Sequence, residues 1–421
     1  MADLAPFRGI RYDPTAVGDL AAVVSPPYDV ISERDHDALE AASPYNIVRL
    51  ILGRDEPGDH ERSNRYTRAR ALVETWLAAG ILRRDDAEGL YIYEQRFSFG
   101  GEQKVQRGVL GAVRLDEPGG GVLPHERTYD EIVEDRLALL RATATNLDCI
   151  LCVYDGQDAS AHEAVEGATR AEPAARFSTP DGVEHRVWIL SEPAGIAAVV
   201  RAVAKATVVI ADGHHRHQTA LRYAAERAES EGPGLWDAQL MFLVDASKWG
   251  PALLPIHRTI RGAGADAALA ALEPVFRIED APAGDPEALA DELAKRRIYG
   301  RTFAMLDGKR AWWLTVKDRV AEREAMPAER SAAWRDLDVA VLHVLVFEQL
   351  IGGVETGFAH SAGEAAERVG AGDADLAFLL APMPFDAVRA VAEAGEAMPQ
   401  KSTYFIPKPA TGIVLRTMQE G

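Results

Sequence analysis

Residues 208–229 read VVIADGHHRHQTALRYAAERAE, and this stretch decides the fold class. The apolar run before Asp212 is typical of a buried strand, and apolar residues recur at helical spacing from Leu221 to Ala228. Between the two patterns, Gly213 marks a tight turn. A strand that passes through a glycine turn into a helix is a building unit of α/β proteins. We therefore expect an α/β (α+β) chain with mixed sheets and helices.

The neighbouring sequence supports this expectation. A hairpin is predicted where residues 91–99 and 105–115, both rich in strand-favouring side chains, flank the turn GGEQ. Residues 147–154, LDCILCVY, read as a buried strand, so we interpret the two cysteines as core thiols rather than a redox pair. From about residue 264 the sequence becomes rich in alanine. We place one α/β region at 1–263 and a second at 264–421.

Composition excludes several classes of protein. The chain has 421 residues, of which 46 are Lys or Arg and 65 are Asp or Glu, giving a net charge of −19. This surface would repel a nucleic acid, although a small phosphate compound needs only a local pocket. The N-terminus lacks an apolar secretory stretch, and the most apolar window, 339–354, is interrupted by His343 and Glu348. We expect a cytoplasmic protein that neither spans a membrane nor binds nucleic acid.

The turn at residues 212–216 is the strongest candidate site. Backbone N–H groups at a helix start lie at the positive end of the helix dipole, where phosphate binds readily. Gly213 lets the backbone come close, Arg216 can form paired hydrogen bonds to phosphate oxygens, and His214 and His215 can donate hydrogen bonds or exchange protons. Asp212 could hold Mg²⁺ or cap the helix. The simpler alternative is a capped helix start with two surface histidines.

Two further segments contribute candidates. His125 and Glu126 precede another predicted helix, and a glutamate with a nearby histidine is suited to taking a proton from a hydroxyl. The alternative is that Glu126 and Arg127 form a solvated charge pair. Lys401 lies in a proline-flanked segment near the C-terminus. It could bind a phosphate, or it could be an exposed side chain at the start of a strand with no role in binding.

A metal-dependent hydrolase is a second hypothesis. His125, Asp212, His214, His215 and His257 are residue types that bind zinc, but their spacing is not that of a helical H-E-x-x-H pair. The chain contains no Walker A sequence, no strand-linked G-x-G-x-x-G and no G-x-S-x-G elbow. The common nucleotide-binding and acyl-transfer motifs are therefore absent.

Taken together, the motifs resemble the domain of unknown function 1015 family of prokaryotic cytosolic proteins. The resemblance covers nearly the whole chain, and it departs at His217, where an aromatic is expected, at Gln218, where an acidic residue is expected, and at the cysteines. The segments that carry it are SPPYDVIS, YNIVRLIL, YEQRF, RGVLGAVRL, LPHERT, DRLALLRAT, IADGHHRHQTALRY, LLPIHR and MPQKSTYFIPKP.

The strand–DGHHR–helix unit also resembles the ParB and sulfiredoxin superfamily, which includes kinases of free serine. That resemblance implies a ParB/sulfiredoxin-like nucleotide-binding core with elaborations, a nucleotide site at residues 213–216 and magnesium. We expect a phosphotransferase that uses ATP or ADP and Mg²⁺ and acts on a small hydroxyl compound, with free L-serine as one candidate. Glu126, His125 and His215 are the expected catalytic residues, while Asp212, Gly213, His214, His215, Arg216 and Lys401 are expected to hold the cofactor. A nucleotide-binding regulatory protein without turnover is the remaining alternative. The sequence leaves the oligomeric state open.

Overall fold

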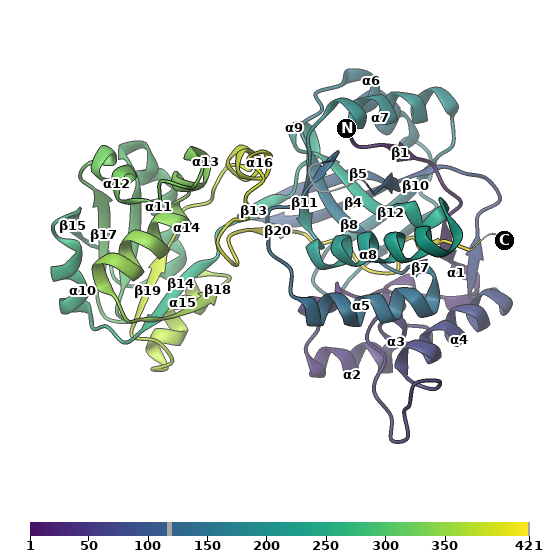
Figure 1. The fold of residues 1–421 in the computed structure, drawn as a ribbon, viewed down its shortest axis with the longest axis horizontal. Coiled ribbons are helices and arrows are strands. Elements are labelled where there is room, and N and C mark those ends of the chain that lie inside the picture. The colour runs from purple at the N-terminus through teal and green to yellow at the C-terminus, as the bar shows by residue number, and fades with distance from the viewer. Residues whose placement is uncertain (116–119, 420–421) are drawn as a thin grey trace. The chain divides into compact units, whose positions relative to one another are not determined.

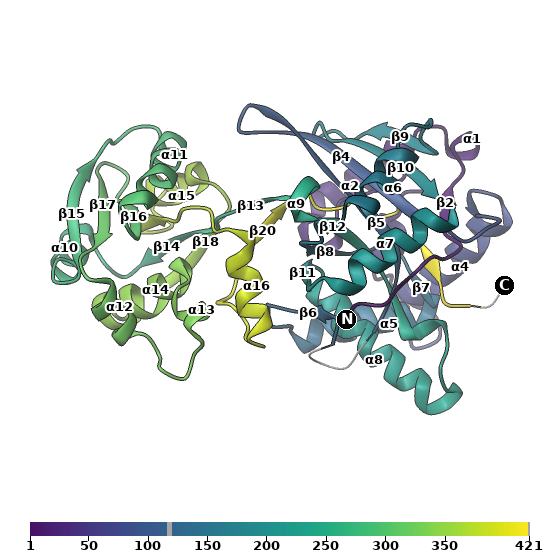
Figure 2. The same cartoon turned by 90° about the horizontal axis from the view of Figure 1, so that it is seen from above.

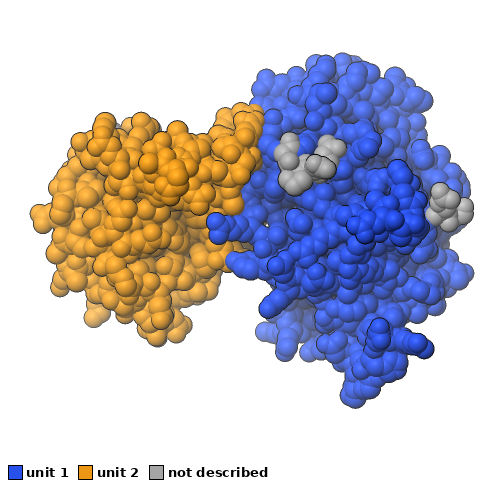
Figure 3. Space-filling model, viewed as in Figure 1, with its two compact units in different colours: residues 1–251, 407–421 blue, residues 252–406 orange. Residues whose placement is uncertain are grey.

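The computed structural model describes residues 1–115 and 120–419. The chain forms two compact units, one of residues 1–251 and 407–421 and the other of residues 252–406 (Figure 3). We expected a boundary after residue 263, but β14 (His257–Arg261) pairs with β18 (Glu355–Ala359) and β19 (Leu376–Leu379) and therefore belongs to the second unit. The last residues of the chain return to the first unit.

A nine-stranded sheet forms the centre of the first unit. Its order is β6-β11-β8-β12-β5-β4-β10-β9, with β1 beside β5. β11 runs parallel to β6 and antiparallel to β8, so the sheet is mixed and the predicted α/β class is confirmed. The strands are β1 (Leu4–Ala5), β4 (Leu90–Phe99), β5 (Glu102–Arg114), β6 (Val122–Leu123), β8 (Ile150–Tyr154), β9 (Ala175–Ser178), β10 (Glu184–Leu190), β11 (Val208–Asp212) and β12 (Ala238–Asp245).

Helices cover both faces of this sheet. α6 (Ala159–Ala168) and α7 (Pro193–Lys205) lie on one face, and α5 (Asp130–Thr143) and α8 (His214–Glu231) lie on the other (Figure 1). Because alternate residues of a strand face opposite ways, Ile150 and Cys152 pack with the helices α6 and α7. On the opposite side, Leu137 of α5 packs against Tyr223 of α8.

The N-terminal segment forms a second layer of the first unit. Ser32 caps the start of α2 (Glu33–Ala42), since its side chain accepts from the Asp35 N–H in a capping box. Ile47 and Trp76 belong to the core of this layer. Its elements are β2 (Ile10–Tyr12), α1 (Pro14–Val17), η1 (Leu20–Ala22), η2 (Tyr28–Val30), α2 (Glu33–Ala42), α3 (Val48–Ile51), α4 (Arg65–Ala78) and β3 (Leu82–Arg84). The returning C-terminus adds β21 (Arg416–Thr417), which pairs with β7 (Thr145–Asn146).

Two local predictions are confirmed in the first unit. β4 and β5 form the expected hairpin, which Figure 2 shows from above, and they pair from Tyr91 with Leu110 to Phe99 with Glu102. Cys149 and Cys152 are free, buried thiols. Burial raises the pKa of Cys149 to about 12, so this thiol stays protonated at neutral pH. The connection from β12 onward adds α9 (Ala246–Trp249), and η3 (Leu235–Asp237) precedes β12.

The second unit contains a six-stranded antiparallel sheet in the order β15-β17-β16-β19-β14-β18. Small side chains such as Ala365 and Ala377 let α15 (Ala362–Gly370) pack closely on this sheet, beside Trp313 and Leu293. The remaining elements are β13 (Ala252–Leu254), α10 (Ala265–Leu272), β15 (Phe276–Ala281), α11 (Pro286–Arg296), η4 (Arg297–Tyr299), β16 (Thr302–Leu306), β17 (Ala311–Val316), α12 (Arg319–Ala325), α13 (Ala332–Arg335), α14 (Asp338–Val341), the π-helix η5 (Leu342–Ile351), α15 (Ala362–Gly370), α16 (Phe385–Glu393) and β20 (Tyr404–Ile406). In the described ranges of both units, no helix has the length and apolar character needed to cross a bilayer.

Candidate anion-binding site

The turn between β11 and α8 is built around Gly213. Its φ of +107° lies in the left-handed region that side chains rarely adopt. A Cβ at this position would also lie 3.0 Å from Nε and Nη2 of Arg216. α8 begins at His214, and the cap residue gives its first N–H groups no side-chain hydrogen bond. The helix start therefore presents backbone donors beside a buried guanidinium.

Arg216 is held inside the protein by two carboxylates. Its side chain is 7% exposed, Nη1 lies 3.0 Å from Asp148 Oδ2, and Nη2 lies 2.5 Å from Asp212 Oδ2. Nη1 also donates to the Cys149 carbonyl. Burial alone would lower the pKa of Arg216, but the two carboxylates outweigh burial and raise it. In this arrangement protein oxygens already occupy Nη1 and Nη2, and the role of Arg216 as a phosphate ligand stays a prediction.

Arg216 lines a cavity of about 40 Å³. Asn146, Asp148, Arg216 and Gln239 are among the polar residues that line it. This volume has room for water but not for a nucleotide base. This cavity is therefore not the site of a nucleotide base.

Lys408 completes the group of charges. Its Nζ lies 2.6 Å from Asp29 Oδ2 and 2.7 Å from Asp212 Oδ1. Burial would lower the pKa of Lys408, and the two carboxylates raise it instead, so the ammonium stays charged. We call Asp29, Asp148, Asp212, Arg216 and Lys408 the Asp212 cluster.

The predicted Lys401 is not part of this cluster. It lies in the second unit, where its side chain is exposed and its carbonyl accepts from Arg258 Nη2. Its role as a cofactor ligand stays a prediction.

The Asp212 carboxylate does not fit a magnesium ion in this arrangement. One of its oxygens faces the Arg216 guanidinium and the other faces the Lys408 ammonium. Burial would raise the pKa of Asp212, but these two cations lower it and keep the group charged. A divalent cation at the same oxygens would be repelled by two positive charges at hydrogen-bond distance.

His214, His125 and Glu126, which are all expected site residues, lie together in the structure. His214 Nε2 accepts from the His125 N–H at 3.3 Å, which leaves the ring proton on Nδ1, 3.5 Å from Glu126 Oε2. The two imidazoles pack edge to face, 4.6 Å apart. Burial lowers the pKa of both His125 and His214 to about 3, so both rings are neutral at pH 7. Two neutral rings therefore flank a partly exposed carboxylate.

His215 points to a different neighbour. Its Nε2 accepts from the Tyr129 N–H at 3.1 Å, and the two rings stack 5.9 Å apart. This contact links the start of α8 to the start of α5.

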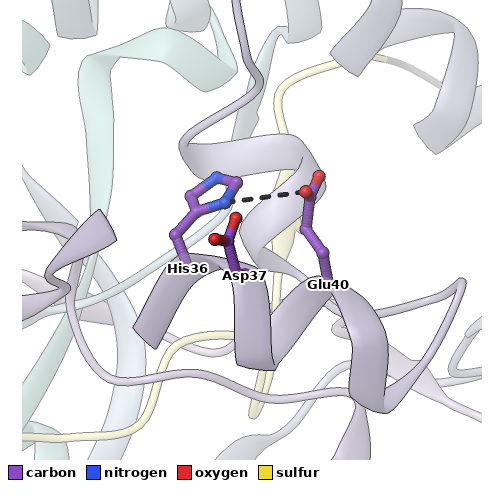
Figure 4. Close-up of side chains that lie close together, drawn as sticks. All are labelled: His36, Asp37 and Glu40. Atoms are coloured by element: carbon purple, nitrogen blue, oxygen red, sulfur yellow. Dashed lines mark ion pairs between the residues drawn. The ribbon is translucent and has the colours of Figure 1, made fainter. Parts of the chain in front are cut away.

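A group with metal-like geometry occurs elsewhere, on α2. Figure 4 shows His36, Asp37 and Glu40, whose ligand atoms lie within 4.8 Å of one another. The Arg54 guanidinium contacts all three side chains. It contacts Asp37, and it lies 3.1 Å from Glu40 Oε2 and 2.8 Å from His36 Nδ1. The group therefore binds an arginine of its own chain.

In the described residues, the predicted zinc ligands at the turn do not form a group of three or more with metal-binding geometry. Within residues 1–115 and 120–419, the set on α2 is the one group of three or more candidate ligands that could hold a metal. His257 belongs to β14 of the second unit, and its Nδ1 accepts from the Leu380 N–H.

Sequence reasoning missed three members of the Asp212 cluster, namely Asp29, Asp148 and Lys408. Asp29 lies in the SPPYDVIS motif and Lys408 lies in the MPQKSTYFIPKP motif, so both were inside segments that carry the family resemblance. The available signal was that two distant motifs each contain a charged residue beside prolines. Nothing in the order of residues says that they meet at Asp212.

The fold and the cluster define a two-unit α/β protein with a charged strand-to-helix turn. The chain belongs to the family described as Protein of unknown function (DUF1015), whose pattern matches residues 4–340.

Solved structures show a weak likeness. A conserved hypothetical protein from Pyrococcus furiosus is 13% identical with a TM-score of 0.33, over 75% of this chain and 96% of that one. A free serine kinase in complex with AMP is 13% identical with a TM-score of 0.33, over 71% and 87%. SbnI with a C-terminal truncation, from Staphylococcus aureus, is 12% identical with a TM-score of 0.32, over 70% and 82%. No curated protein matches the chain.

Proposed function

We propose that this protein is a phosphotransferase that moves a phosphoryl group from ATP or ADP to a small hydroxyl compound. The observation that carries the proposal is the position of Glu126 beside His214, the first residue of α8. A carboxylate that can accept a proton thus lies next to a helix start that can bind phosphate. Free L-serine is the first acceptor to test.

In the proposed reaction Glu126 acts as the general base. The acceptor hydroxyl attacks the terminal phosphorus while its proton passes to the Glu126 carboxylate. A new oxygen–phosphorus bond forms, the bond to the bridging oxygen breaks, and ADP or AMP leaves. His214 is neutral and directs Nδ1 toward Glu126, so it orients the carboxylate without competing for the proton.

His125 supports the same arrangement from behind. Its backbone N–H fixes the tautomer of His214, and its ring packs against the His214 ring. We assign His125 and His214 to positioning and Glu126 to proton transfer. His215, whose Nε2 accepts from the Tyr129 N–H, remains a candidate residue at the same helix start.

The test is a transfer assay with labelled ATP or ADP and a panel of hydroxy amino acids. Glu126→Gln keeps the size of the side chain but removes the base, so kcat should fall about 10²- to 10⁴-fold while nucleotide affinity stays unchanged. Glu163→Gln, at an exposed position on α6, is the matched control and should retain full activity.

Two results would count against the proposal. Transfer by Glu126→Gln at the wild-type rate would remove Glu126 from the mechanism. Saturable nucleotide binding without product from any acceptor would instead favour the nucleotide-responsive binding protein.

A further inference from the structure

Lys408 has one hydrogen-bond donor to spare. An ammonium carries three N–H donors, and two of them point at Asp29 and Asp212. Across the part of the chain that the structure describes, the third donor has no protein partner. The side chain is 13% exposed, so this donor lies at the edge of the protein interior.

A buried polar network fixes the backbone that carries Lys408. Gln95 Nε2 donates to the Lys408 carbonyl at 2.9 Å, and Gln106 Nε2 donates to the Pro407 carbonyl at 3.1 Å and to Gln95 Oε1 at 2.7 Å. Both glutamines are fully buried. Buried amides are costly unless they are hydrogen-bonded, so this network holds the segment in one register on β4 and β5.

The two carboxylates on Lys408 differ in exposure. The Asp212 side chain is 14% exposed and also binds Arg216, whereas the Asp29 side chain is 41% exposed and lies on the short helix η2. An exposed ion pair contributes little free energy, because water competes with both partners. Asp29 is therefore the counter-ion that an incoming anion can replace.

A second donor beside the turn also lacks a partner. Nε of Arg216 is buried without a hydrogen-bond acceptor, and it lies 3.0 Å from the place that a Cβ of Gly213 would take. Such a donor costs free energy while it stays unpaired. Two cationic side chains thus leave a donor unpaired on either side of Asp212.

We propose that Lys408 is the phosphate ligand of this site and that a nucleotide phosphate displaces Asp29 from it. The proposal rests on the proposed function for the identity of the anion and assigns Lys408, rather than Lys401, as the lysine that binds it. Asp212 stays on Lys408 and Arg216, and the phosphate oxygen takes the place of the Asp29 carboxylate.

The experiment measures binding of ADP and of adenosine to the full-length chain by calorimetry. Lys408→Met should weaken ADP binding by about 10- to 100-fold, because a charge-assisted hydrogen bond is lost, and should leave adenosine binding unchanged. Lys205→Met, at an exposed position on α7 of the same unit, is the control and should bind ADP like the wild type.

Asp29→Asn tests the displacement directly. Removing the competing carboxylate should tighten ADP binding by about 2- to 5-fold and leave adenosine binding unchanged. A carboxylate with a purely structural role would give no gain in affinity. This variant also keeps the proposal testable if Lys408→Met does not fold.

The outcomes separate the two proposals. A wild-type chain that binds no ADP overturns the proposed function and the lysine assignment together. A wild-type chain that binds ADP, with Lys408→Met equally tight or Asp29→Asn no tighter, overturns the lysine assignment alone.

Discussion

At the scale of single residues, buried histidines make the folded state sensitive to acid. His217 on α8 is 8% exposed, and burial lowers its pKa from 6.5 to about 4. Between pH 6.5 and pH 4, His217 binds a proton in the unfolded chain but stays neutral in the folded chain. Stability is therefore lost as pH falls through this window, by about 2 kcal/mol at pH 5 for this group.

His217→Phe removes the titrating group and places there the aromatic that the family resemblance leads us to expect. The free energy of unfolding, measured with urea at pH 7.5 and pH 5, should then fall less for the variant than for the wild type. Because each protein is compared with itself, any packing cost of phenylalanine cancels. Exposed His60, changed to Gln, is the control, and an equal loss in all three proteins would refute the argument.

The sequence indicates which residues are candidates for the site better than it indicates which residues contact one another there. The strand-to-helix turn follows from a local pattern, and so does the choice of His214, which begins α8, and of His125 and Glu126, which precede α5. The carboxylates around Arg216 do not, since Asp148 is far from it in sequence and is brought near by the sheet. An arginine beside a glycine turn suggests a phosphate ligand until the tertiary contacts are known.

At the scale of elements, the β11–α8 turn depends on a residue without a side chain. Gly213→Ala must hold a left-handed φ and press on Arg216, so we expect a loss of about 1–3 kcal/mol in the free energy of unfolding. The measurement is denaturant unfolding, with nucleotide binding as a second readout.

Gly167→Ala is the matched control. Gly167 is exposed within α6, and a Cβ there would meet no atom within 4 Å. Because alanine favours the helix, this variant should gain about 0.5–1 kcal/mol. Equal effects of the two substitutions would show that neither the backbone conformation nor the contact with Arg216 matters.

Element types were predictable where periodicity is strong, as in the β4–β5 hairpin. The apolar window at residues 339–354 contains the end of the short α14 followed by the π-helix η5. Helical spacing of apolar residues cannot distinguish the two, because η5 is apolar over most of its length. Its one imidazole, His343, accepts from the buried Arg258 Nε at 2.7 Å, a tertiary contact that no local pattern contains.

At the scale of the whole molecule, the second unit is an insertion in the first. The chain leaves the first unit at Pro251 and returns at Pro407. Ala252 pairs with Ile406 in the antiparallel ladder of β13 and β20, so the two ends of the insertion are neighbours. Composition does not locate the start of the second unit, because the alanine-rich sequence begins only after β14, which already belongs to that unit.

Replacing residues 252–406 by a short Gly-Ser linker should therefore leave a first unit that folds by itself. Its nine-stranded sheet, the helices on both faces and every member of the Asp212 cluster lie within residues 1–251 and 407–421. We expect a single cooperative thermal transition and, on the proposed function, ADP affinity equal to that of the full chain. A chain that stops at residue 406 is the comparison, since it lacks Lys408 and β21.

If the linked chain does not fold, the second unit supplies stability that the sheet of the first unit lacks. If it folds but binds no ADP while the full chain does, residues 1–251 and 407–421 are not sufficient for binding.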